Sequence, residues 1–204
     1  MTWIFVAANL AGFVLELSLG GGVDAFVRRW GLVPADAFES LRGNESPAAL
    51  ITLVTSMFLH AGWLHLLFNL LYLGVFGLPV ERRIGAVRFA LLYLVSGLVG
   101  SVAYLVAQPA SDVPAIGASG AIAGVIAAHL VLYPGATLGS LAPVLFLHVV
   151  ESTPTLLLLL LWLATQLFSS VASLTTTTGI AWWAHLGGFA SGLALAPVLR
   201  KRRQ

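Results

Sequence analysis

Six apolar runs, each near the length that crosses a bilayer, restrict the fold of this chain more than any other feature of its sequence. A membrane-spanning helix needs about 20 mainly apolar residues to cross roughly 30 Å of hydrocarbon. Of the 204 residues, 59% are hydrophobic and 9% are charged, and the mean hydropathy of +0.96 lies far from that of soluble domains. We therefore expect an all-α polytopic membrane protein, a bundle of six transmembrane helices at residues 3–20, 58–78, 87–107, 119–133, 155–172 and 181–199.

The segments between the runs favour a single membrane domain over residues 1–204. No polar linker divides the runs, and no internal repeat supports an inverted-repeat transporter. Residues 21–57, between the first two helices, mix acidic and apolar side chains, so we expect a membrane-associated outer loop. Residues 134–153 are too short to cross and should dip into the membrane or lie at its surface, and residues 173–180 form a short polar connector.

Basic residues are divided unevenly between the two sides of such a bundle. One side carries Arg82, Arg83, Arg88, Arg200, Lys201, Arg202 and Arg203, and the other carries Arg28, Arg29 and Arg42. The positive-inside rule therefore places both termini in the cytoplasm. The first run has no basic segment before it and no small-residue cleavage site after it, so we expect it to be retained as a span. The net charge of +2 is an orientation signal with nothing that favours nucleic acid, and the absence of cysteine excludes disulfides and thiolate chemistry.

Two polar side chains in the second run, His65 and Asn69, are four residues apart and so share one face of a helix. A polar group within hydrocarbon is costly unless it has a partner or a function. Hydrogen bonding between helices would explain both residues. Taken alone they favour this structural explanation, and a polar site inside the bundle is the alternative.

Small residues predict a close crossing of the fourth and last runs, because they let two helix backbones approach. The glycines concerned are Gly120 and Gly124 in the fourth run and Gly188 and Gly192 in the last. His185 lies on the same stripe as the glycines of the last run, and Ser119 precedes those of the fourth. The crossing would therefore bring His185 near Ser119. The fourth run is short if it begins at Ser119, which leaves room for a cavity above it.

Taken alone, Ser119 is explained by packing, since small residues are common at such crossings. Paired with His185 it could perform acyl transfer, because a neutral imidazole can take the hydroxyl proton as the oxygen attacks a carbonyl. No carboxylate is placed to complete a triad; Glu16 is near the outer end of the first run and has no assigned role. The site would be a Ser–His dyad. A helix start at Ser119, together with His65 and Asn69, would supply donors to an oxyanion.

These motifs resemble those of the rhomboid family of intramembrane serine proteases. The similar stretches are RWGLVPADAF (29–38), SMFLHAGWLHLLFNLLYLGVFG (56–77), VERRIGAVRF (80–89), IGASGAIAG (116–124) and WWAHLGGFASG (182–192). Together the patterns GxSG, AHxxG and HxxxN form a specific combination, whereas GxSG alone would be weak.

The resemblance implies a role for each candidate residue. Ser119 would be the nucleophile, His185 the general base, and His65 and Asn69 the oxyanion stabilisers with the backbone at Ser119. The structural glycines would be Gly117 and Gly120, which frame the serine, and Gly188 and Gly192, which hold the last helix against the fourth. The implied fold is six helices around a water-filled cavity open to the outside. No cofactor and no metal is expected, since the chain has no HExxH motif or carboxylate cluster.

Two positions depart from the family pattern. Many rhomboids carry a Trp-Arg pair in the first outer loop, where this chain has LITLVT (50–55), so the loop must be anchored differently. Some members stack a tyrosine on the base histidine, where this chain has Ala123. His185 must therefore be oriented by other neighbours, such as Trp182 or Trp183.

The resemblance also implies partners and location. The partners would be the lipid bilayer and transmembrane protein substrates, unwound near a helix-breaking Gly or Pro and cut near the outer end. Residues 155–172 and the connector after them would move to admit the substrate. The protein would be a multi-pass integral protein of a prokaryotic cytoplasmic membrane. The alternative is a non-catalytic relative that binds membrane-protein helices; a small transporter or channel has only the polar cavity in its favour.

Overall fold

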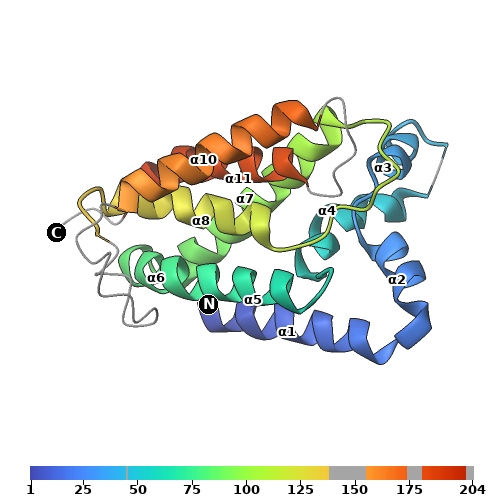
Figure 1. Cartoon of the computed structure of the whole chain (residues 1–204), viewed down its shortest axis with the longest axis horizontal. Helices are drawn as coiled ribbons and strands as arrows, with labels where there is room; N and C mark the ends of the chain where they lie inside the picture. The colour runs from blue at the N-terminus through green and yellow to red at the C-terminus, as the bar shows by residue number, and fades with distance from the viewer. Residues whose placement is uncertain (45, 138–154, 174–180, 201–204) are drawn as a thin grey trace.

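Helices form nearly all of the regular structure in the computed structural model, which describes residues 1–44, 46–137, 155–173 and 181–200 (Figure 1). The long helical segments are α1 (Thr2–Ser18), α5 (Trp63–Tyr72) continuing through a π-helical turn (Leu73–Gly77) into α6 (Leu78–Ile84), α7 (Ala86–Ala107), α8 (Ser119–Leu132), α10 (Thr155–Ala172) and α11 (Trp182–Leu199). The short ones are α2 (Val23–Trp30), α3 (Pro34–Leu41) and α4 (Thr52–Thr55), with 3-10 turns at Gly20–Gly22, Pro47–Ile51 and Ser56–Phe58. The described residues form no β-strand, which agrees with the expected all-α class.

Helix α8 lies at the centre of the bundle. It is apolar on all sides, and every residue from Gly120 to His129 is buried, as expected for a helix surrounded by others. Its most extensive contacts are with α7 and α11, which also pack against each other, and α10 lies outside them against α11. The chain α5–α6 and then α1 lie on the other side of α8 in Figure 1. The start of α8 is therefore covered from several directions.

Glycines allow α8 and α11 to cross at backbone contact. A Cβ on Gly188 would be 1.9 Å from the carbonyl oxygen of Gly120, and a Cβ on Gly192 would be 2.0 Å from that of Gly124. No side chain fits at such distances, so the crossing depends on glycine at both positions of α11. The close crossing predicted from the small residues is present.

The described residues include three helical segments long and apolar enough to span a membrane: Trp63–Ile84, Ala86–Ala107 and Thr155–Ala172. A fourth is possible if Thr2–Ser18 and Gly20–Trp30, which meet at 111°, are one bent span. The protein is thus a membrane protein with several apolar spans. By helix length and apolar composition, three or four spans are identified among the described residues, fewer than the six expected. Helix α8 has 14 residues, which is about 21 Å at 1.5 Å per residue.

The second run differs from its predicted bounds. The helix begins at Trp63 and continues to Ile84, whereas the apolar run predicts residues 58–78. Arg82 and Arg83 consequently lie in the last turn of α6 rather than in a loop. Apolar composition locates the middle of a span better than its ends, because a helix continues past the hydrocarbon into polar residues.

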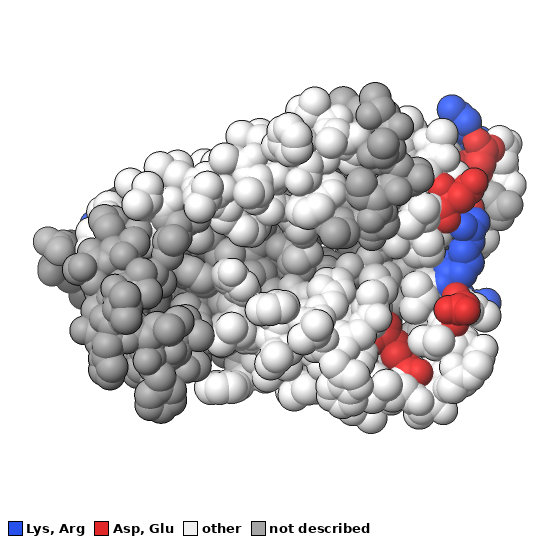
Figure 2. All heavy atoms as spheres, viewed as in Figure 1, with Lys and Arg blue, Asp and Glu red and all other residues white. Residues whose placement is uncertain are grey.

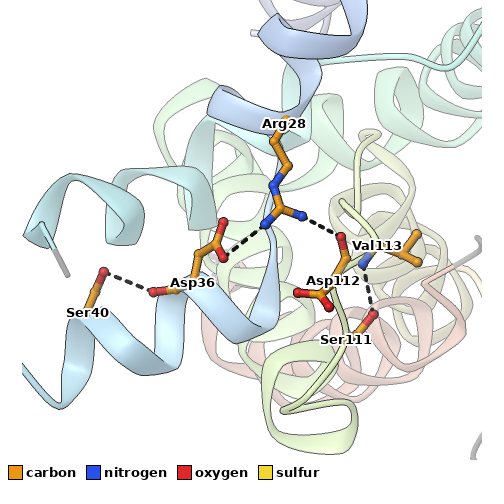
Figure 3. Close-up of polar contacts among 6 residues, drawn as sticks. All are labelled: Arg28, Asp36, Ser40, Ser111, Asp112 and Val113. Atoms are coloured by element: carbon orange, nitrogen blue, oxygen red, sulfur yellow. Dashed lines mark hydrogen bonds and ion pairs between the residues drawn. The ribbon is translucent and has the colours of Figure 1, made fainter. Parts of the chain in front are cut away.

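Residues 21–57 fold into short helices that are tied to the segment before Ser119. Arg28 donates to Asp36 Oδ1 at 3.1 Å and to the carbonyl of Asp112 at 2.7 Å (Figure 3). An antiparallel bridge joins Leu32 and Ala115, with N···O distances of 3.0 and 2.8 Å. These contacts anchor the loop formed by residues 21–57, for which the sequence predicts an anchor other than the Trp-Arg pair.

Charged side chains gather over α2 and α3 at one end of the molecule, and the face between the two ends is uncharged over a wide area in this view (Figure 2). The exposed residues of α5, α7 and α10 include large apolar side chains, such as Leu64, Val87 and Leu161. Exposed apolar surface of this kind suits contact with lipid. Residues 138–154, 174–180 and 201–204 lie outside the described residues. The fold therefore does not test the predictions for the segments 134–153 and 173–180 or for Lys201, Arg202 and Arg203.

Candidate active site

Ser119 and His185 are brought together by the crossing of α8 and α11. Ser119 is the first residue of α8, and His185 lies in the first turn of α11. Their side chains are in hydrogen-bond contact, with Oγ of Ser119 2.7 Å from Nε2 of His185. The two residues are 66 positions apart in the chain, so their contact is a product of the tertiary fold.

Both side chains line a cavity of about 520 Å³. Its walls come from α5, the segment before α8, α8 itself, α10 and α11, and they combine apolar surface with a few polar groups. The polar and aromatic lining residues are His65, Phe68, Asn69, Tyr72, Ser119, Trp162, Gln166, Trp182 and His185. A largely apolar cavity with convergent polar groups is typical of a substrate-binding or catalytic site.

His65 and Asn69 lie one turn apart on α5 and face the same cavity. The backbone N–H of Ala61 donates to Nδ1 of His65 at 3.4 Å, so the neutral ring carries its proton on Nε2 and offers a donor there. The amide nitrogen of Asn69 donates one proton to the carbonyl of His65 at 2.9 Å, which leaves a second proton for another acceptor. Both side chains therefore offer a donor in the cavity that Ser119 also lines.

Gly117 is required by both backbone conformation and space. Its φ of +119° is one that side-chain-bearing residues rarely adopt. A Cβ at this position would also lie 2.7 Å from Nε2 of His65. Gly120 is less restricted, since its Cβ would lie 3.3 Å from the carbonyl oxygen of Ala184. The two glycines that frame Ser119 thus have different physical reasons for being glycine.

The second ring nitrogen of His185 has a partner that the sequence analysis missed. Nδ1 of His185 lies 2.6 Å from Oε1 of Gln166 on α10. Two tryptophan rings also lie close, with Trp182 edge-on at 5.9 Å and Trp162 tilted at 6.3 Å between ring centroids. Of the two expected orienting residues, Trp182 is beside the imidazole, whereas Trp183 packs in a separate apolar cluster with Leu32 and Tyr104. Gln166 is the one amide in the run 155–172, whose other polar residues are threonines and serines, and this is the signal that could have directed attention to it.

Glu16, His129 and the polar residues at 148 and 175–178 have no expected catalytic role, and they lie away from this pair or outside the described residues. Glu16 accepts from the backbone N–H of His60 at 3.1 Å and is buried there, so it supports the turn before α5. His129 packs between Phe76 and Tyr133 on α8. His148 and Thr175–Thr178 fall outside the described residues. No three His, Asp or Glu side chains within the described ranges are grouped to hold a metal ion.

The arrangement is suited to acyl transfer. It provides a hydroxyl in contact with an imidazole nitrogen, donors on α5, and the start of α8, where backbone N–H groups have no acceptor within the helix. The positive end of the α8 dipole adds to the attraction of developing negative charge.

Comparison with known proteins points to one family. The rhomboid domain model matches residues 47–202. The chain is 47% identical over 78 residues to the rhomboid protease GluP of Bacillus subtilis (38% of this chain and 15% of that protein). It is 32% identical over 152 residues to RHOMBOID-like protein 5 of Arabidopsis thaliana (74% of this chain and 45% of that protein). It is also 38% identical over 88 residues to inactive rhomboid protein 1 of Drosophila melanogaster (43% of this chain and 6% of that protein).

The matched regions cover less than half the length of each of these relatives, so what those proteins do as a whole is not carried over by the match alone. The family domain, however, covers most of this chain, from residue 47 to residue 202. The matched range contains Ser119, His185, His65 and Asn69. This chain belongs to the rhomboid family.

Proposed function

We propose that this protein is an intramembrane serine endopeptidase that cuts transmembrane segments of other membrane proteins. The observation that carries the proposal is the 2.7 Å contact between Ser119 Oγ and His185 Nε2 inside a cavity bounded by membrane helices. Packing alone would explain a small residue at position 119, but it would not require a histidine nitrogen aligned with the hydroxyl.

In the first half of the reaction, Ser119 Oγ attacks the carbonyl carbon of the scissile peptide bond while His185 Nε2 takes the hydroxyl proton. The carbonyl oxygen becomes an oxyanion. Nε2–H of His65, the free amide proton of Asn69 and the backbone N–H of Ser119 are the donors proposed to stabilise it. Gly117 matters here because it lets the backbone before Ser119 lie against the His65 ring.

The intermediate then collapses. The C–N bond breaks, the leaving amine takes the proton from His185, and the C-terminal fragment departs with its new amino terminus, leaving the N-terminal fragment as an acyl ester on Ser119. A water molecule next gives its proton to His185 and attacks the ester, which releases the carboxylate fragment and returns the proton to Ser119. No cofactor and no metal is needed for these steps.

The substrate would reach the site from the side of the bundle. Helix α10 covers the cavity through Trp162 and Gln166 while much of its remaining surface is exposed, so displacement of α10 is the proposed route of entry. A helical backbone hides its carbonyls, and a segment weakened by Gly or Pro would unwind most readily into the cavity.

The proposed location is a prokaryotic cytoplasmic membrane, with both termini inside. Arg82, Arg83 and Arg88 would face the cytoplasm, and the α2–α3 region would face outward. Because the chain has no cysteine, single-cysteine variants test this directly. An impermeant maleimide added to intact cells should label Glu39→Cys and not Arg83→Cys; the reverse pattern would overturn the orientation.

The function is tested with purified full-length protein in liposomes containing a single-span substrate helix. Wild type should cleave the substrate and be labelled by a fluorophosphonate probe. Ser119→Ala and His185→Ala should neither cleave the substrate nor be labelled. Equal cleavage by wild type and Ser119→Ala would refute the assignment. Substrate binding by a wild type that neither cleaves nor reacts would instead support the alternative of a non-catalytic helix binder, which the similarity to an inactive rhomboid protein keeps open.

A further inference from the structure

Gln166 contacts the imidazole of His185 on the nitrogen opposite to the one that contacts Ser119. Its side chain comes from α10 and is 4% exposed. The distances to the two ring nitrogens are similar, 2.6 Å from Gln166 Oε1 to Nδ1 and 2.7 Å from Ser119 Oγ to Nε2. The imidazole is thus held between a hydroxyl on α8 and an amide on α10.

The orientation of the Gln166 amide follows from the hydrogen bonds of Thr165. A carbonyl has no proton to give, so the Thr165 hydroxyl must donate to the carbonyl of Trp162, at 2.6 Å. The Thr165 oxygen then offers lone pairs to its other neighbour, and Nε2 of Gln166 donates to it at 3.3 Å. Because Nε2 of Gln166 donates to Thr165, the amide oxygen Oε1 is the atom that faces His185.

This orientation determines which nitrogen of His185 carries the proton. An amide oxygen only accepts, so Nδ1 of His185 must be the donor. A neutral imidazole has one N–H, which leaves Nε2 bare and able to accept from Ser119. With the other tautomer, Nε2–H would donate to Ser119 and could not remove its proton. The hydrogen bonds therefore run in one direction, from Ser119 through His185, Gln166 and Thr165 to the carbonyl of Trp162.

We infer that Gln166 is a positioning residue for His185, holding the imidazole in the tautomer that makes Nε2 a base toward Ser119. The inference rests on the proposed function and extends the Ser–His dyad to a Ser–His–Gln arrangement. Because Gln166 and Thr165 both belong to α10, the base has this tautomer only while α10 is seated against α11. Trp162, which contacts the rings of both His185 and Phe189, contributes to that seating. Displacement of α10 to admit a substrate would release the base, and its return would restore it.

The kinetic test uses full-length protein in liposomes. Gln166→Leu has a similar size but no acceptor, and we expect its kcat to fall about 10- to 100-fold with little change in KM. This is a part of the roughly 10²- to 10⁴-fold that general acid–base catalysis supplies, because the imidazole itself is still present. Gln166→Glu keeps an acceptor oxygen and should retain most of the activity. Thr165→Val removes only the group that orients the amide and should have a smaller effect than Gln166→Leu. Phe168→Leu is the matched control, since this side chain is on the same helix and 78% exposed.

A spectroscopic test reads the tautomer without requiring catalysis. In protein labelled with 15N-histidine, the ring-nitrogen shifts of His185, assigned by comparison with His185→Gln, should show a proton on Nδ1. In Gln166→Leu and, less fully, in Thr165→Val they should show a mixture of tautomers. A wild-type proton on Nε2, or an unchanged tautomer in Gln166→Leu, would overturn the inference.

The two proposals fail in different ways. A wild type that cleaves no substrate while its tautomer still depends on Gln166 would remove the proposed function and leave the positioning role. A wild type that cleaves, with Gln166→Leu equal to it in kcat and tautomer, would remove the positioning role and leave the protease.

Discussion

Gly188 of α11 and Gly120 of α8 lie so close that a Cβ on Gly188 would be 1.9 Å from the carbonyl oxygen of Gly120. Gly120 follows Ser119 directly, and Gly188 lies one turn after His185. The backbone contact of the two glycines therefore determines how far apart the serine and the histidine are held. The glycine contact that packs the two helices and the Ser119–His185 pair thus lie at the same helix crossing.

Gly188→Ala should separate α8 from α11. The new methyl group would overlap a backbone carbonyl that cannot move away, and overpacking of this kind costs about 1–3 kcal/mol. We expect a lower thermal unfolding midpoint in detergent and weaker fluorophosphonate labelling of Ser119. Gly74→Ala is the control, because a Cβ there meets nothing within 4 Å; similar midpoints for the two variants would contradict the explanation.

His65→Ala and Asn69→Ala should each lower kcat while leaving KM nearly unchanged. Each removes one proposed donor to the oxyanion, and loss of such a donor typically lowers kcat about 10²- to 10³-fold. Initial rates of substrate cleavage over a range of substrate densities in liposomes give both constants. Leu64→Ala is a suitable comparison, since Leu64 lies on the same helix with its side chain 70% exposed; an equal loss in this variant would point to damage of α5 rather than of the site.

His60 should make stability depend on pH. Burial, with a smaller contribution from nearby His65, lowers the pKa of His60 from 6.5 to about 4. The unfolded chain therefore binds a proton at this histidine more readily than the folded protein does. The contribution of neutral His60 to the stability of the folded state is complete above about pH 6.5 and is lost progressively as the pH falls toward 4.

His60→Phe has no titrating ring at this position. The thermal unfolding midpoint of wild type should therefore fall faster than that of His60→Phe between pH 6.5 and 4. The slope contributed by one such group is at most about 1.4 kcal/mol per pH unit. Parallel curves for the two proteins over this range would show that His60 is not the group responsible.

Arg28→Ala should loosen the outer loop more than it destabilises the protein. The side chains of Arg28 and Asp36 are 48% and 45% exposed, and an exposed ion pair contributes about 0–1 kcal/mol. The variant should unfold within about 1 kcal/mol of wild type, while the amide protons of Leu32 and Ala115 exchange faster with solvent. Asp36→Asn keeps the hydrogen bond from Arg28 to Asp112, so these two amide protons should exchange more slowly in this variant than in Arg28→Ala. Equal exchange in wild type and Arg28→Ala would mean that the Leu32–Ala115 bridge needs no help from Arg28.

Several helices could be located from apolar runs alone. The runs at 87–107, 155–172 and 181–199 correspond to Ala86–Ala107, Thr155–Ala172 and Trp182–Leu199, because a long apolar segment in a membrane must satisfy its backbone internally as a helix. The short helices of residues 21–57 could not be predicted in the same way. They are held by contacts such as Arg28 with Asp112 and Leu32 with Ala115, which join segments over 80 residues apart.

The sequence by itself determined the membrane class, the family motifs, and the faces on which Ser119, His185, His65 and Asn69 lie, because hydropathy and helical periodicity are local properties. Only the tertiary structure decided that Gln166 meets His185 and that Glu16 meets the backbone of His60. Helical periodicity predicts the side of a helix on which a residue lies. It does not predict which neighbouring helix that side will contact or how closely the two helices will approach. Those depend on how closely the helices cross, and in this protein glycine contacts between α8 and α11 set that distance.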